Sequence, residues 1–275
     1  MDLDIFPIEV TFIIKSYIIY IPISKIELKI AIDLWCNNYE KAIEKYGHIT
    51  LWNTKNITNM DNLFHSKHKF NNDISSWNVK NVTSMRLMFF DNYYFNQNLN
   101  RWNVSNVKDM YGMFCGCHIY NKPMNKWNVT KVSNMKSMFS FTNSLNIELS
   151  NWNTKNVIDM SYMFFKSYSF NCNINNWNVK NVTNMEYMFS NANNFNMPLN
   201  NWKVQNVTNM SGMFFYSNSF NQCLNLWNIE NVRNMDVMFD NAFLFNKLLE
   251  NWNVKNVTSM SNMFSKFHRK PKWYK

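Results

Sequence analysis

Apolar residues recur along this chain with a period of 25 positions. A tryptophan opens each unit, a methionine follows eight positions later, and a phenylalanine follows twelve positions later. No insertion or deletion interrupts the period. In a stack of coils each unit touches only its neighbours, so an insertion would push one coil's core residues out of line. We therefore predict nine stacked coils whose structural core contains Trp52, Trp77, Trp102, Trp127, Trp152, Trp177, Trp202, Trp227 and Trp252.

The pattern inside one unit predicts a strand followed by a short helical segment. Residues 98–104 show a short apolar alternation at Trp102 and Val104, which is typical of a strand. A turn at Asn106 follows, and the next apolar residues are spaced as on one face of an α- or 3₁₀-helix: Val107, Met110, Met113 and Phe114. We expect a leucine-rich-repeat-like β-solenoid of nine 25-residue coils, with the strands of successive coils paired in parallel.

Asparagine makes up about one residue in five, and it keeps the register of the repeat. One column runs from Asn71 to Asn246 and a second from Asn53 to Asn253, with Lys203 as the exception in the second. Asparagine tolerates a left-handed backbone and bonds to its own main chain, so we expect it at the corners of the coils. Stacked asparagines can also bond from coil to coil.

The repeat resembles the BspA-like leucine-rich repeat family. The resemblance rests on Trp-Asn-Val-x-Asn-Val-Thr-Asn-Met-x-x-Met-Phe, as in residues 177–189, and covers residues 52–264. That family is known from bacterial surface proteins, protists and large DNA viruses. The resemblance implies a right-handed curved solenoid and a role in adhesion or protein interaction, without catalysis. The richness in Asn, Lys and Ile favours an AT-rich genome of the protist or giant-virus type.

The first 48 residues lie outside the repeat and predict packed helices. Glu9 and Lys15 would be costly at membrane depth, so we expect no membrane span. Asp2 and Asp4 stand where a signal peptide would be positively charged. The apolar spacing of residues 10–18 predicts a first helix. Residues 24–27 form a capping box that opens a second helix, although the alternation of apolar residues that follows also permits a strand. Residues 38–46 can make a third helix, which completes an α-helical cap.

This segment also resembles an F-box, from a Phe-Pro start at residues 6–7 to a late tryptophan. The resemblance implies docking on a Skp-type adaptor of a ubiquitin ligase. The residues implied in that contact are Pro7, Glu9, Ile13, Ile14, Tyr17, Ile18 and Trp35. The alternative is a segment that only shields the end of the stack, in which case these side chains would be buried against Trp52.

The net charge is +10, and part of it forms a column three residues after the tryptophans. The column, a hypothetical partner-binding edge, contains Lys55, Lys80, Lys155, Lys180 and Lys255. It would suit an acidic partner, but a solvated lysine edge that discourages aggregation is the simpler interpretation. We expect nucleic acid not to be the partner. Residues 266–275 form a basic C-terminal tail after the solenoid of residues 49–265.

The chemistry-bearing residues do not form a catalytic or metal-binding pattern. His65 and His68 are the only neighbouring histidines, and the five cysteines have no coherent spacing. No glycine-rich phosphate loop is present. We therefore expect neither enzymatic activity nor a cofactor, metal or small-molecule substrate.

Two functions remain open from the sequence. In the first, an intracellular protein (in the host cytoplasm if viral) binds a ligase adaptor through its N-terminal helices and a target protein through its repeats. In the second, the chain is a surface or adhesion-type binding protein without a ubiquitin link.

Overall fold

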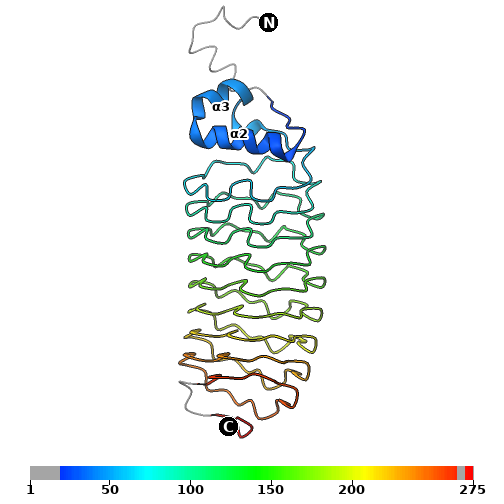
Figure 1. The fold of residues 1–275 in the computed structure, drawn as a ribbon, viewed down its shortest axis with the longest axis vertical. Helices are drawn as coiled ribbons and strands as arrows, with labels where there is room; N and C mark the ends of the chain where they lie inside the picture. Colours follow the sequence, from blue (N-terminus) through cyan, green and yellow to red (C-terminus); the bar gives the residue numbers. More distant parts are fainter. Residues whose placement is uncertain (1–18, 265–269, 275) are drawn as a thin grey trace, which may run out of the picture.

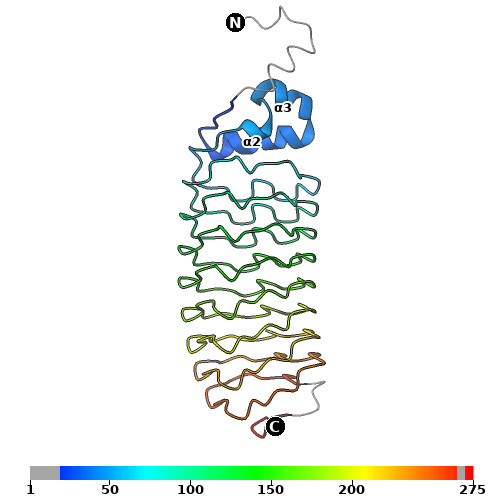
Figure 2. The ribbon, with the colours of Figure 1, turned by 180° about the vertical axis from the view of Figure 1, so that it is seen from behind.

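The computed structural model describes residues 19–264 and 270–274. Flattened coils of 25 residues lie one above another in a single column, and two helices lie across its N-terminal end (Figure 1). The view from behind shows the same layers without crossing connections (Figure 2). Each coil therefore contacts the coils before and after it in sequence.

The expected β-solenoid is wrong, because the described residues contain no β-strand and no sheet. They contain only isolated parallel bridges, one for each step between coils, from Asn59 with Ser84 to Asn234 with Ser259. The predicted strand at residues 98–104 is irregular chain with a two-residue turn. The predicted helical side is a series of turns as well, so neither regular element of the expected coil is present.

A series of hydrogen-bonded turns replaces the strand and helix, and we call the side of the stack that it forms the turn face. In the first coil the turn face comprises residues 59–67. Every second N–H donates to the next coil: Met60 to Ser84, Asn62 to Arg86, Phe64 to Met88 and Ser66 to Phe90. The N–H groups between them close turns inside the coil: Leu63 to Met60, His65 to Asn62 and Lys67 to Phe64. The backbone is thus satisfied without a sheet.

The turns depend on left-handed residues at two positions, ten and fourteen residues after each tryptophan. These positions have positive φ angles in successive coils, for example 51° at Leu87, 54° at Asp91 and 47° at Val237. A residue with positive φ at the third place of a turn is the signature of a type II turn, and it interrupts a helix. The i, i+3 spacing of the methionines therefore comes from stacked turns.

The core consists of columns of identical side chains. The nine repeat tryptophans are each at most 4% exposed. Their rings stack: the centroids of Trp127 and Trp152 are 6.3 Å apart, and the angle between the ring planes is 0°. From Trp77 onward each indole N–H donates to the backbone oxygen 28 residues earlier, as Trp152 does to Met124 at 3.1 Å. A buried indole N–H needs such a partner, so the tryptophan also fixes the register between coils.

The two asparagine columns bond in different ways. In the first, each Oδ1 accepts the backbone N–H of the asparagine one coil later, as Asn171 does from Asn196 at 2.9 Å. In the second, the side chain accepts an N–H two residues ahead in its own coil, as Asn178 does from Lys180 at 3.1 Å. The expected coil-to-coil bonding is confirmed. The left-handed positions, however, lie elsewhere in the coil.

Two α-helices and a 3₁₀ turn cover the N-terminal end: α2 (Lys25–Asn37), α3 (Tyr39–Tyr46) and η2 (Ile49–Leu51). Ser24 caps α2 by accepting the N–H of Glu27, whose carboxylate accepts the N–H of Ile23. The segment after this capping box is therefore a helix, and the strand that the alternating apolar residues also permitted is not formed. Gly47, with a φ of 68°, ends α3 and turns the chain toward the first coil.

The C-terminal end carries a different cover. Trp273 stacks on Trp252 with ring centroids 6.3 Å apart, which is the spacing between successive repeat tryptophans. Its indole N–H donates to the Leu249 oxygen at 2.8 Å, the acceptor that a tenth repeat tryptophan would use. Tyr274 packs edge-on against Phe264. Residues 270–274 thus lie against the last described coil.

Candidate protein-binding surfaces

The helical cap buries the one proposed adaptor-contacting residue that the structure describes. Trp35 is 4% exposed and packs edge-on against Trp52, with centroids 5.9 Å apart. Its indole N–H donates to Asn72 Oδ1 at 3.1 Å. Trp35 therefore belongs to the cover of the stack. The other residues of that set lie outside the described residues: Pro7, Glu9, Ile13, Ile14, Tyr17 and Ile18.

The opposite face of α2 carries exposed isoleucines beside the Lys29–Asp33 ion pair. Ile26 and Ile30, one helical turn apart, are 73% and 55% exposed, and Ile23 precedes them at 80%. The face buried against the stack contains Leu28, Ala31, Ile32 and Trp35. Three exposed isoleucines side by side are unusual on a protein surface that contacts only water.

The lysine column lies where the repeat places it, on the surface beside the second asparagine column. Its five members are exposed: Lys55, Lys80, Lys155, Lys180 and Lys255. Successive coils are joined here by asparagine side chains that donate to the backbone of the preceding coil, for example Asn181 Nδ2 to the Lys155 backbone oxygen at 2.7 Å. None of the five forms an ion pair with another described residue. The lysine side chains are therefore available to solvent or to an acidic partner.

On the turn face the buried positions are constant, whereas the outer positions change from repeat to repeat. Methionine and phenylalanine occupy the buried positions in every coil. By contrast, the position ten residues after tryptophan holds in turn Asn62, Leu87, Gly112, Ser137, Tyr162, Tyr187, Gly212, Val237 and Asn262. The positions thirteen and fourteen residues after tryptophan vary just as widely. A constant core here supports a surface of varied chemistry.

Six aromatic rings gather on the turn face of the fourth to seventh coils. This aromatic patch comprises Phe141, Tyr162, Phe165, Tyr187, Phe215 and Tyr216. Phe165 packs edge-on against Phe141 at 5.3 Å and Tyr162 at 5.7 Å. Tyr187 stacks on Tyr162 at 5.3 Å and meets Phe215 at 6.2 Å. Phe141 and Tyr216 at the two ends are 37% and 39% exposed, so the patch reaches solvent.

Two lysine ammonium groups lie over the rings of the patch. Lys166 Nζ is 5.1 Å from the centroid of Phe141 and 5.5 Å from that of Phe165, and Lys136 Nζ is 5.9 Å from that of Tyr162. The Tyr162 hydroxyl donates to Glu186. Partial burial and the nearby Glu186 carboxylate raise the pKa of Tyr162 to about 12, so the phenol is neutral at physiological pH.

Sequence reasoning missed the aromatic patch. The tyrosines and phenylalanines stand at variable positions of the repeat, so a search for the repeated pattern passes over them. A comparison of what differs between units would have found them, since four consecutive units each place a further aromatic residue ten, thirteen or fourteen positions after tryptophan, beside the constant phenylalanine.

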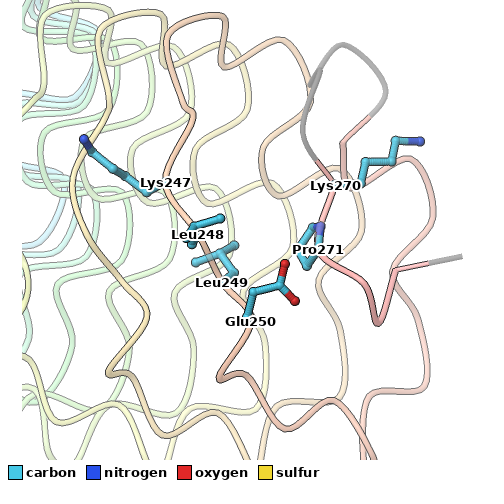
Figure 3. Close-up of a pocket in the computed structure, with 6 residues that line it drawn as sticks. All are labelled: Lys247, Leu248, Leu249, Glu250, Lys270 and Pro271. Atoms are coloured by element: carbon cyan, nitrogen blue, oxygen red, sulfur yellow. The ribbon is translucent and has the colours of Figure 1, made fainter.

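The histidines and one crevice are the features that bear on metal or small-molecule binding. Among residues 19–264 and 270–274, no three His, Cys, Asp or Glu side chains gather as metal ligands. His65 and His68 stack on Phe90 and Tyr93 instead. A shallow crevice lies between the last coils and the C-terminal segment (Figure 3). It is lined by Lys247, Leu248, Leu249, Glu250, Lys270 and Pro271.

The cysteines are free thiols. Cys115, on the turn face, and Cys117 are buried, and burial raises the pKa of the Cys115 thiol to about 12. A thiol with so high a pKa is almost entirely protonated near neutral pH and is therefore a poor nucleophile.

Stacked coils with a constant core and a varied face define a repeat protein. A family model described as "Mycoplasma protein of unknown function, DUF285" matches residues 36–148, 123–225 and 173–272, which together cover most of the chain. The protein belongs to that family. No curated protein and no solved structure matches the chain. In the part of the chain that the structure describes, no helix has the length and apolar character needed to cross a membrane.

Proposed function

We propose that this protein is a non-enzymatic scaffold that binds another protein on its turn face. The observation that supports this proposal is the contrast between constant buried positions and variable outer positions on the same segment of the coil. Packing alone explains why the buried methionines and phenylalanines repeat. Packing does not account for the contacting aromatic rings at the outer positions of the turn face, which recognition of a partner would use.

The turn face is suited to binding because its backbone is fixed before a partner arrives. Successive coils are joined along it by up to four backbone hydrogen bonds, such as Tyr187 N–H to the Ser211 oxygen at 2.8 Å. A surface that is already ordered loses little conformational entropy on association. Aromatic residues held on such a surface are typical of the few side chains that dominate binding energy.

A display library of random peptides, selected on the full chain, tests this proposal. Enriched ligands should lose binding to a turn-face variant that combines Leu87→Asn, Phe90→Ser, Phe165→Ser and Tyr216→Asn. Each substitution introduces a residue that another coil already holds at that position. Binding should persist in a lysine-column variant that combines Lys80→Ser, Lys155→Thr and Lys180→Ser, which follow the same rule. Failure to enrich any ligand, or equal binding to both variants, contradicts the proposal.

We propose intracellular protein recruitment as the setting, and adaptor docking through the N-terminal region as a second function. The observation that favours docking is the open face of α2 with Ile23, Ile26 and Ile30. An apolar stripe at helical spacing fits a helix-in-groove contact with an adaptor. Because Trp35 is buried against Trp52, the contact would have to use the opposite side of α2 from the one that the F-box resemblance implies.

We predict that a purified Skp-type adaptor binds the full chain and loses at least about tenfold in affinity for Ile26→Glu/Ile30→Glu, because the charges would lie in an apolar contact. Leu226→Glu, at a side chain that is 81% exposed in a distant coil, is the control. Isothermal titration of the three proteins measures the effect. An adaptor that does not bind, or binds all three equally, would leave the repeats as a binding protein without a ubiquitin link, as expected for an adhesion-type relative.

A further inference from the structure

We infer that the aromatic patch binds a short extended segment of a partner protein that combines acidic with aromatic or large aliphatic side chains. This inference rests on the proposed scaffold function and names the kind of ligand that one part of the turn face takes. It follows from the rings, from the two lysines above them and from the length of the patch.

The apolar component of the ligand follows from the exposed ring surface. Six aromatic side chains touch one another in a continuous chain from Phe141 to Tyr216, although the coil positions that hold them accept Ser, Asn or Gly elsewhere. Clustered exposed aromatics of this kind are enriched at protein interfaces. The chain therefore exposes aromatic side chains at positions where the fold itself requires no apolar residue.

The acidic component follows from Lys136 and Lys166. Both are only partly exposed and lie against ring faces. Neither ammonium group forms an ion pair with a carboxylate in the described part of the chain. A ligand carboxylate would supply the missing opposite charge next to an apolar surface, where water screens the attraction less than in bulk solvent.

The length of the ligand follows from the spacing of the coils. Four coils separated by roughly 4.8 Å place the two ends of the patch about 14 Å apart. An extended chain covers that distance with about four residues. Both lysines lie in the fourth and fifth coils, so the carboxylates belong at one end of the segment and the apolar side chains continue toward Phe215 and Tyr216.

The ring geometry favours a peptide over a single-stranded nucleic acid. Nucleic-acid platforms present ring faces on which successive bases stack. Here Tyr162 and Tyr187 cover each other's faces, with planes 17° apart, and Lys166 lies over Phe141 and Phe165. These covered faces are not available to stack a base, whereas a peptide can contact the rings and the ammonium groups through its side chains.

Fluorescence anisotropy with the full chain and labelled probes tests the inference. The probe is a hexapeptide with three glutamates at one end and three phenylalanines at the other, prepared in both chain directions. It is compared with versions carrying lysine for glutamate or alanine for phenylalanine, and with hexathymidylate. We expect the glutamate–phenylalanine peptide to bind at least about tenfold tighter than each comparator. Equal binding of a comparator peptide, or tighter binding of hexathymidylate, overturns the inference.

Protein variants locate the binding. Phe165→Ser/Tyr216→Asn should weaken probe binding at least about tenfold, and Lys136→Ser/Lys166→Asn should remove the preference over the lysine peptide. The matched control is Phe90→Ser, the same position in the second coil. All of these substitutions introduce residues found at the same position in other coils, and circular dichroism checks the fold. If ligands from the peptide selection depend on Leu87 and Phe90 while the patch variants bind them normally, the scaffold function stands and this inference fails.

Discussion

Trp152→Ala should lower the free energy of unfolding by about 3–5 kcal/mol, because it removes a large buried ring from the middle of the stack. The indole is 3% exposed and stacks on Trp177 at 6.2 Å. Its N–H also fills a hydrogen bond to Met124, whose oxygen would lose its partner. Chemical denaturation measures the loss.

The same substitution near the end of the column gives a graded comparison. Trp252→Ala should cost less than Trp152→Ala, because the last coil and its C-terminal cover can unfold without disrupting the other coils. Leu226→Ala, at an 81% exposed side chain, should change stability by no more than about 0.5 kcal/mol. Equal small losses at both tryptophans would show that the columns do not hold the stack together.

Gly116→Val should cost about 2–4 kcal/mol for a different reason, namely a backbone that leaves no room for a side chain. Gly116 has a φ of 78°, and a Cβ there would lie 3.1 Å from the Asp91 Cα and 2.4 Å from its Oδ1. Asp91 has little freedom to move, because its N–H donates to the Cys115 oxygen at 2.8 Å. Thermal or chemical unfolding measures the change.

Phe141→Val is the matched control, at the same position one coil later with a φ of 57°. This substitution places a valine in the same left-handed backbone conformation, at a position where the neighbouring coil already accommodates a Cβ. A loss for Gly116→Val that is no larger than the loss for Phe141→Val would rule out the close approach as its cause.

The sequence alone was sufficient to predict the repeat, its nine units and its helical N-terminal cover, because these depend on spacing and on burial of apolar residues. The same spacing led to a wrong prediction of a strand and a short helical segment inside each coil. A spacing of three residues, as between Met110 and Met113, is found on one face of a helix and also in overlapping turns. Periodicity therefore does not distinguish the two conformations.

The residues that decide between helix and turns carry no clear signal. Left-handed backbone usually marks glycine or asparagine, yet Leu87, Tyr162 and Val237 hold these positions. Their conformation is imposed by hydrogen bonds to the next coil, which no single unit reveals. The aromatic patch escaped prediction for a related reason, since its members are neighbours only after the coils stack.

The alternating hydrogen bonds of the turn face give that side of the stack an electrical direction. Along each such column a peptide group accepts from the preceding coil through its C=O and donates to the following coil through its N–H, as the group between Ser84 and Met85 does. Peptide dipoles of about 3.5 D therefore add head to tail across the coils, as they do in a helix. The sense along the chain is reversed: the positive pole of these columns lies at the C-terminal coil, and the negative pole lies beside the helices of the N-terminal cover.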